Sequence, residues 1–288
     1  AINPKLMLTI ATNAGVDKYS LIELGKIHPY LNYINLMSYD FHGTWERMTG
    51  HAAPLYPSNT APYAYPANTY AIDTAVQAFL AGGVPANKLV VGIPFYGRGW
   101  RGVPSANNGL WQVSSGAASG TYEAGVDDYK VIQALNYPVY RDENAAAVWK
   151  YNGDSFWSYD DEQTITAKMA YIRAHNLGGA MAWSLDGDNG TLLPAMYRGL
   201  QNSVAAPISS AKGGAMAFAD GAGGTSHVVE VPEGAVTEPI TLKAQIAPLG
   251  DSLTIGLQPA GSAFVIDAYQ AGERLASFTF AKPFTVTI

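Results

Sequence analysis

Four short, continuously apolar runs mark the first two hundred residues of the chain. Strands of a parallel sheet covered by helices on both faces have this pattern, because neither face of such a strand meets water. The runs predict strands at 6–12, 33–41, 88–100 and 179–185.

Each predicted strand is followed, directly or after an insertion, by a segment with helical spacing of its apolar residues. These segments are 19–31, 71–84, 160–179 and 191–200. The second ends at glycines, and the third begins with acidic residues and ends at glycine, as helices often do. The alternation predicts an α/β fold of four βα units, where a complete (β/α)8 TIM barrel has eight.

One segment interrupts this alternation between the third strand and its helix. Residues 101–158 are rich in Gly, Ser, Tyr and Trp and show no long helical period. We therefore expect a separate α+β insertion there.

The pattern changes near residue 205. All six Trp and all but one of the 18 Tyr precede that point. The small, polar stretch 203–214 is typical of a linker. We expect one domain at 1–204 and a second at 205–288. Alternation of apolar and polar residues in the second domain predicts an antiparallel β-sandwich, with strands at 240–247, 253–258, 263–270, 276–281 and 284–288.

Composition excludes several classes of function. The net charge is −6 and no basic stripe is present, so neither nucleic acid nor an anionic membrane is an expected partner. The chain has no cysteine, which excludes disulfides and thiolate chemistry. No apolar run reaches the roughly 20 residues of a spanning helix.

Candidate chemistry lies where the predicted strands end, because barrels of this type carry their active sites at the carboxyl ends of the strands. A two-residue period puts Met37 and Tyr39 on one face of the second strand, and it turns Asp40 away unless the strand has already ended. The candidate residues at the three strand ends are Met37, Tyr39, Asp40, Tyr96, Arg98 and Trp183.

Three motifs carry a resemblance to a known family. "LMSYDFHGTW" with "TGHAAPLY", then "VVGIPFYGRGW", then "YDDEQTITAKMAYIRAHNLGGAMAWSLDGD" occur in that order. Together they resemble the second half of the catalytic barrel of family-18 glycoside hydrolases, the chitinases, over residues 1–200. The resemblance implies strands five to eight of the barrel, with the insertion domain that follows the "PFYGRGW" strand.

The resemblance also implies a reaction: substrate-assisted, retaining hydrolysis of β-1,4-linked N-acetylglucosamine polymers. The substrate's own acetamido oxygen attacks the anomeric carbon. Tyr39 and Asp40 are then the catalytic residues of this chain. The Tyr39 hydroxyl would hold the acetamido oxygen in line, and the Asp40 carboxylate would stabilise the positive charge that develops at the acetamido N–H.

Five further residues are then substrate-binding. Trp183 would form the apolar floor under the sugar, and Trp45 would stack on the leaving-group side. Tyr96 and Arg98 would donate hydrogen bonds to sugar hydroxyls, and Met37 would line the cleft. The implied partners are chitin or N-acetylglucosamine oligosaccharides, with no cofactor and no metal.

One required group is missing. The family supplies its general acid as the Glu of a D-x-x-D-x-D-x-E strand ending, and this motif is absent from the sequence. It belongs to the fourth barrel strand, and we expect both chain ends to be truncations. We therefore predict that the 288-residue chain does not hydrolyse chitin appreciably.

Structural alternatives remain open at several of these positions. Tyr39 and Asp40 are also typical of a strand-end turn, and Arg98 could form an ion pair with Asp40 instead of, or as well as, binding sugar. His42 and His51 lack a third metal ligand at suitable spacing, so we expect them to pack and hydrogen-bond. The family often has a cis peptide bond after the residue equivalent to Trp183.

Rival functions follow from the same residues. The chain could come from a chitinase-like lectin, from a peptidoglycan or spore-wall glycosidase of the same family, or from a surface protein with a vestigial barrel. The resemblance implies a secreted or cell-surface protein. Unpaired edge strands near 6–12 and 179–185 would favour self-association.

Overall fold

The computed structural model describes residues 6–62, 69–200, 203–219, 226–247, 263–271, 273–275 and 277–287. The chain divides into two compact units, Ala1–Leu200 and Gln201–Ile288. Within the described residues, no helix combines the length and apolar character needed to cross a bilayer.

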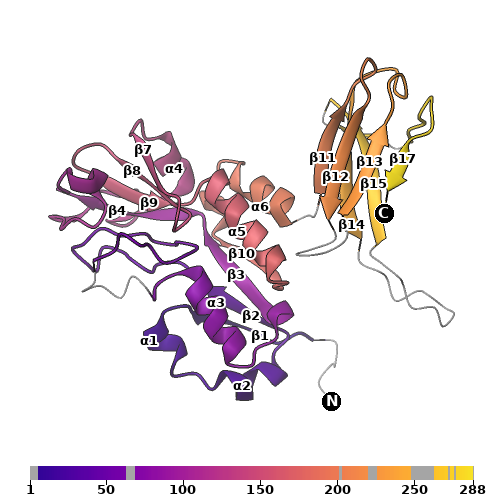
Figure 1. Cartoon of the computed structure of the whole chain (residues 1–288). Coiled ribbons are helices and arrows are strands. Elements are labelled where there is room, and N and C mark those ends of the chain that lie inside the picture. The colour runs from indigo at the N-terminus through magenta and orange to yellow at the C-terminus, as the bar shows by residue number, and fades with distance from the viewer. Residues whose placement is uncertain are drawn as a thin grey trace. The chain divides into compact units, whose positions relative to one another are not determined.

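The first unit is built on a parallel four-stranded sheet (Figure 1). Its order is β1-β2-β3-β10, so β1 and β10 form the two edges of the sheet, as the sequence predicted. The strands lie close to the predicted runs, at β1 (Thr9–Asn13), β2 (Tyr33–Met37), β3 (Leu89–Pro94) and β10 (Gly179–Trp183).

Three of the four predicted helices form. They are α3 (Ile72–Ala81), α5 (Glu162–Ala174) and α6 (Leu192–Leu200). The prediction of one helix over 19–31 is wrong, because the chain forms short turns of helix that are interrupted after Tyr19 and pass into the proline at position 29. These turns are α1 (Val16–Tyr19), α2 (Leu24–Ile27) and the 3-10 helix η1 (His28–Tyr30). Further 3-10 helices are η3 (Ala86–Lys88), η4 (Ala106–Gly109) and η5 (Leu185–Gly187).

The core of this unit lies between the sheet and its helices. The buried apolar residues of β2 and β3 belong to one core cluster with buried residues of α3 and α5. Burial of each such side chain stabilises the fold by about 1.5–3 kcal/mol. Along β2, Ile34 and Leu36 are buried in this core, whereas Asn35 and Met37, on the other face, are only half-buried.

The insertion is an antiparallel sheet with one helix, α4 (Tyr129–Ala134). The prediction of one continuous strand at 88–100 is wrong. The chain leaves the parallel sheet after Pro94, and β4 begins at Tyr96 in the second sheet, where it pairs with β5, β6 and β9. The strands of this sheet are β4 (Tyr96–Arg101), β5 (Gly116–Ala117), β6 (Val126–Asp128), β7 (Val139–Asp142), β8 (Ala147–Tyr151) and β9 (Phe156–Tyr159).

The second unit contains two antiparallel sheets, of order β11-β14-β15-β16 and β12-β13-β17. Buried residues of both sheets, such as Leu242 and Val229, belong to one apolar cluster. The strands are β11 (Ser203–Ile208), β12 (Gly214–Ala219), β13 (Ser226–Val231), β14 (Ile240–Ala247), β15 (Ala263–Gln270), β16 (Glu273–Arg274) and β17 (Thr285–Thr287).

Two expectations for this unit are wrong. The stretch 203–214 is no linker, because six of its residues form β11 and pair with β14. Residues 277–281 form no strand, and aromatic contacts among Phe278, Phe280 and Phe284 fix this segment instead. The strand expected at 253–258 lies outside the described residues.

Candidate active site

Asp40 stands at the end of β2, where the backbone changes direction. The strand ends at Met37, and Asp40 has a φ of 59°, in the left-handed region that Asp tolerates better than most residues. The strand has therefore ended before Asp40, which removes the conflict between Tyr39 and Asp40 in the two-residue pattern. Both side chains can serve the same site.

The Asp40 carboxylate accepts three hydrogen bonds from the insertion's first strand. Arg98 donates from Nε to Oδ1 at 2.8 Å and from Nη2 to Oδ2 at 2.7 Å. Tyr96 donates from its hydroxyl to Oδ2 at 2.8 Å. Such a forked arginine–carboxylate pair fixes both geometry and charge. The ion pair considered for Arg98 is thus present.

Tyr96 and Arg98 reach Asp40 from β4, not from the end of the third barrel strand as predicted. Because they are two residues apart on one strand, they lie on the same face of β4. The insertion therefore supplies the donors, while the parallel sheet supplies the acceptor. The site joins the two sheets of the first unit.

Aromatic rings surround the ion pair. The Arg98 guanidinium lies 5.2 Å from the centroid of the Trp45 ring and 5.5 Å from that of Tyr96, both within cation–π range. Tyr39 and Tyr96 meet edge to face, with ring centroids 6.1 Å apart. The Trp45 side chain is still 59% exposed, so one face of its ring is available to a ligand.

The environment keeps both tyrosines protonated. Burial, with the charge of Asp40, raises the pKa of Tyr39 to about 12. Burial and the same carboxylate raise the pKa of Tyr96 still further. Burial lowers the pKa of Arg98, but its hydrogen bond to Asp40 and the attraction of that charge outweigh burial and leave the pKa above its ordinary value. Tyr39 is therefore a hydrogen-bond donor at any physiological pH.

A cavity of about 250 Å³ borders this cluster. Tyr39, Asp40 and Trp45 line it together with Glu46, Tyr70 and part of the segment 13–18 after β1. Glu46 was not predicted from the sequence, although it directly follows Trp45. Its carboxylate lies 3.1 Å from His42 Nδ1 and accepts the Trp45 indole N–H at 3.2 Å.

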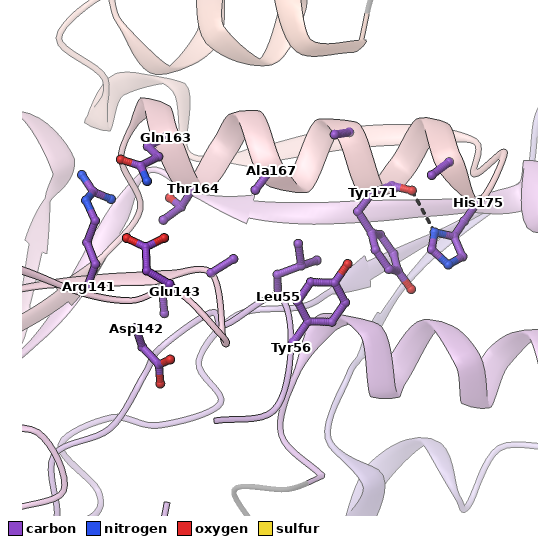
Figure 2. A pocket seen from close by; sticks show the side chains of 14 residues that line it. Leu55, Tyr56, Arg141, Asp142, Glu143, Gln163, Thr164, Ala167, Tyr171 and His175 are labelled. Atoms are coloured by element: carbon purple, nitrogen blue, oxygen red, sulfur yellow. Dashed lines mark hydrogen bonds between the residues drawn. The ribbon is translucent and has the colours of Figure 1, made fainter. Parts of the chain in front are cut away.

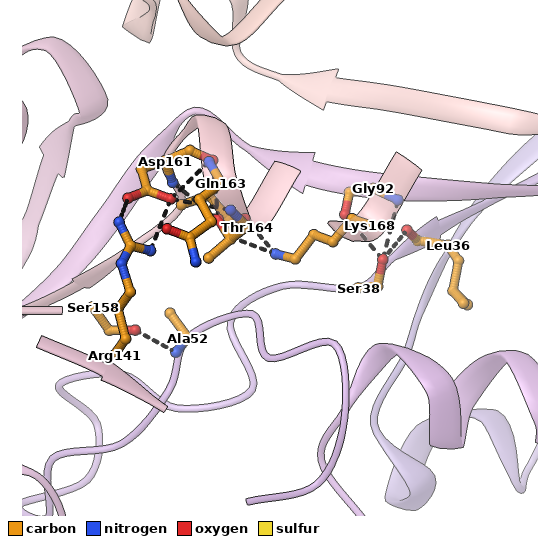
Figure 3. Close-up of polar contacts among 11 residues, drawn as sticks. Leu36, Ser38, Ala52, Gly92, Arg141, Ser158, Asp161, Gln163, Thr164 and Lys168 are labelled. Atoms are coloured by element: carbon orange, nitrogen blue, oxygen red, sulfur yellow. Dashed lines mark hydrogen bonds and ion pairs between the residues drawn. The ribbon is translucent and has the colours of Figure 1, made fainter. Parts of the chain in front are cut away.

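Small residues near the ends of β2 and β3 leave room for the large side chains of the site. Ser38 and Gly92 are two of them (Figure 3). A Cβ on Gly92 would lie 2.7 Å from the Tyr39 ring and 2.5 Å from the Leu36 carbonyl oxygen, so only glycine fits beneath Tyr39. The buried Ser38 hydroxyl accepts the Gly92 N–H at 3.1 Å and lies 3.0 Å from the Gly92 carbonyl oxygen. Ser38 thereby ties the end of β2 to β3.

Met37 and Trp183 stand at the ends of β2 and β10, two strands of the parallel sheet. Met37 is a half-buried residue at the end of β2. Trp183 ends β10, where its carbonyl oxygen accepts the Phe95 N–H at 2.8 Å and its side chain is 62% exposed. It is therefore not a core residue. The Trp183–Ser184 peptide bond is cis, as the resemblance implied.

The two histidines pack and hydrogen-bond as predicted. His42 is buried against Tyr70 and Trp111 and contacts Glu46. His51 is buried against Trp111 and Trp149, with Nε2 3.3 Å from Asp142.

Comparison with known proteins identifies the family of the chain. The model of glycosyl hydrolases family 18 matches residues 2–188. The chain belongs to glycosyl hydrolases family 18. Over 199 residues it is 42% identical to Chitinase A1 of Niallia circulans, and 35% identical to Chitinase 1 of Aphanocladium album. A solved family-18 N-acetylglucosaminidase from Paenibacillus barengoltzii is 34% identical and superposes with a TM-score of 0.60.

These matches cover only part of each protein. The alignment spans 66% of this chain and 28% of the Niallia family-18 protein, and 67% of this chain and 45% of the Aphanocladium protein. The Paenibacillus structure matches over 67% of this chain and 56% of its own. The chain thus spans less than half the length of these two curated relatives. The TIM-barrel type of the fold follows from the family.

Proposed function

We propose that the chain is part of a chitinase that hydrolyses β-1,4-linked N-acetylglucosamine polymers with retention and substrate assistance. The observation that carries this proposal is the Asp40 carboxylate held by Arg98 and Tyr96 beside the protonated hydroxyl of Tyr39. One fixed anion and one fixed donor are what an attacking acetamido group requires.

We propose a role for each of these residues. The Tyr39 hydroxyl donates to the acetamido oxygen and holds it in line with the anomeric carbon. Asp40 stabilises the positive charge that grows on the acetamido N–H, and it can do so without reorganising because three hydrogen bonds already fix it. Arg98 and Tyr96 hold Asp40, and the remaining N–H groups of Arg98 can donate to sugar hydroxyls, whereas the single Tyr96 O–H is already donated to Asp40 and its oxygen can only accept.

The apolar surfaces would bind the sugar rings. Trp183 offers an exposed ring as the floor beneath the sugar undergoing attack, and Trp45 offers one on the leaving-group side. Met37, the last residue of β2, is proposed as a further substrate-binding residue. The proton donor to the glycosidic oxygen is the Glu of the family's missing strand motif, so the 288-residue chain alone is inactive in this proposal.

The architecture proposed with this function has two parts. Residues 1–204 make strands five to eight of the barrel with the insertion, which agrees with a parallel sheet of four strands. Residues 205–288 make a β-sandwich accessory module, which agrees with two antiparallel sheets over one apolar cluster. We also propose a secreted or cell-surface location, as for a protein that acts on an extracellular polymer.

The lectin and wall-glycosidase alternatives have less support. A lectin needs the exposed rings more than it needs a carboxylate fixed by three hydrogen bonds. The insertion, which supplies Tyr96 and Arg98, favours a deep cleft for long chitin-like chains over a peptidoglycan or spore-wall substrate.

Oligosaccharide binding tests the proposed site. We expect N-acetylglucosamine tetramer to change the intrinsic tryptophan fluorescence, and Trp183→Ala to weaken binding by about tenfold, since stacked aromatic anchors are worth more than about 1 kcal/mol. Tyr30→Ala, at an exposed ring outside the site, is the matched control. Equal binding by the Trp183 variant would argue against the proposed sugar floor.

A further inference from the structure

A second cavity, of about 490 Å³, lies in the first unit (Figure 2). It is bounded by α5, by the turn after β7 and by the Leu55–Tyr56 segment that precedes α3. None of its lining residues belongs to the Asp40 cluster. Its volume falls in the range of about 300–1,000 Å³ that is typical of small-molecule sites.

The floor and one wall of this cavity are apolar and aromatic. Ala167, Ala170 and Ala174 form the floor, because helical spacing brings them to one face of α5. Tyr56 and Tyr171 meet edge to face, with centroids 6.0 Å apart. The Tyr171 hydroxyl is occupied by Asp73 at 2.7 Å, whereas the Tyr56 side chain is 40% exposed.

The opposite end of the cavity carries an anion. Figure 2 shows the Glu143 carboxylate extending toward Gln163 and Thr164 at the first turn of α5. Within the described part of the chain, Glu143 forms no salt bridge, while neighbouring Arg141 is already paired with Asp161.

The other nearby carboxylate does not compete for a ligand. Asp142 turns away from the cavity toward His51 and Ser58, whose hydroxyl donates to it at 2.6 Å. Glu143 is therefore the carboxylate that faces the cavity. Arg141 also lines the cavity and is attracted to Glu143, but its guanidinium donates its hydrogen bonds to Asp161.

From this arrangement we infer that the cavity binds a cationic amino sugar, such as the glucosamine units of partly deacetylated chitin. The apolar face of a pyranose ring fits the alanine floor and the Tyr56 ring, and the ammonium group pairs with Glu143. Gln163 and the Tyr56 hydroxyl lie where they can bond sugar hydroxyls. The choice of a sugar over another apolar amine rests on the proposed function. The site would hold chains whose deacetylated units lack the acetamido group that the reaction needs.

Calorimetry with chitobiosamine, the glucosamine dimer, tests this inference on the full chain. We expect one binding site, weakened at least about tenfold by Glu143→Gln, which removes a charge-assisted hydrogen bond. Ala170→Trp should abolish binding by filling the cavity from an exposed helix position. Glu162→Gln is the matched control. Glu162 is an exposed carboxylate in the first turn of α5 that pairs with Arg198, and its replacement should leave binding unchanged.

Three results would overturn the inference: no binding, equal binding by the Glu143 and Ala170 variants, or equal affinity at this site for neutral N,N′-diacetylchitobiose. Cyclohexylamine tests whether the cavity recognises an amino sugar or any apolar amine. If cyclohexylamine binds as tightly as chitobiosamine, the assignment of the ligand as a sugar is wrong. Trp183→Ala should leave chitobiosamine binding intact. If Trp183→Ala also left the binding of N-acetylglucosamine tetramer unchanged, that result would count against the proposed function alone.

Discussion

Asp142 links the insertion to the loop that precedes α3. It accepts hydrogen bonds from Ser58 and from the Ala145 backbone N–H at 3.1 Å, and it lies against the buried His51. Burial raises the pKa of Asp142, but the hydrogen bonds of His51, Ser58 and Ala145 outweigh burial and lower the pKa to about 2.

Asp142 should therefore make stability depend on acid pH. Its folded pKa lies below the unfolded value of about 3.9, so its contribution is fully present above about pH 4 and is lost as the pH falls through about 2. We expect Asp142→Asn to remove about 1–2 kcal/mol of the difference in free energy of unfolding between pH 6 and pH 2.5. Urea titrations at both pH values measure it, with Glu123→Gln as the exposed control. An unchanged pH dependence would disprove this role.

Individual residues of the candidate site could be predicted from the sequence where a recognisable motif contains them. Tyr39, Asp40 and Trp45 stand in one quoted stretch, and the Asp40–Arg98 ion pair was considered from the sequence. The contacts of Glu46 and the close fit of Gly92 under Tyr39 were not predictable, because both depend on how two segments approach in space.

Helix α5 is fixed at its start by charged side chains (Figure 3). Asp161 caps it by accepting the Gln163 and Thr164 N–H groups at 3.1 Å, in a capping box with Thr164. The fully buried Lys168 donates to Asp160 Oδ1 at 2.6 Å. Burial raises the pKa of Asp160 and lowers that of Lys168, because it disfavours the charged form of both groups. The charge of each residue is stabilised by the opposite charge of the other.

Replacing one partner of this buried ion pair should lower the free energy of unfolding more than replacing both partners. We expect Lys168→Met to lower the free energy of unfolding by about 3–5 kcal/mol, because it leaves Asp160 without its cation. The double variant Asp160→Asn with Lys168→Met should recover part of that loss. Chemical denaturation of the single and double variants gives the coupling, and additive effects of the two substitutions would contradict the pairing.

Element prediction succeeded where one periodicity ran without interruption, as in α3 and α5. It failed at 88–100, because a run that is apolar throughout does not reveal that the chain changes sheets after Pro94. It failed again at 203–214, where small residues typical of a linker form a paired strand.

At the scale of the whole molecule, β1 and β10 form the two edges of the parallel sheet, and no strand among the described residues pairs with their outer sides. Open edges and a half-buried inner face favour pairing between chains. We therefore expect the isolated chain to associate, and light scattering should give a mass above that of one 288-residue chain. Ala11→Lys, on the exposed side of β1, should reduce association, and Leu21→Lys, outside the sheet, should not. A monodisperse monomer would contradict this expectation.

The fold class was predictable at this scale because four strand–helix units and three ordered motifs agreed. The strands of the second unit were only partly predictable, since β11, β12 and β13 lack strong alternation of large apolar and polar residues.

The most direct test of the account is to complete the barrel. The chain would be fused behind the preceding half of the catalytic domain of Chitinase A1 from Niallia circulans, and hydrolysis of N-acetylglucosamine tetramer would be measured. The account predicts turnover by the fusion and none by the chain alone. Asp40→Asn should reduce kcat by about 10²–10³, as loss of one fixed electrostatic group does, and Glu123→Gln should not. A fusion that binds the tetramer but shows no turnover, or an Asp40→Asn fusion with undiminished kcat, would contradict the account.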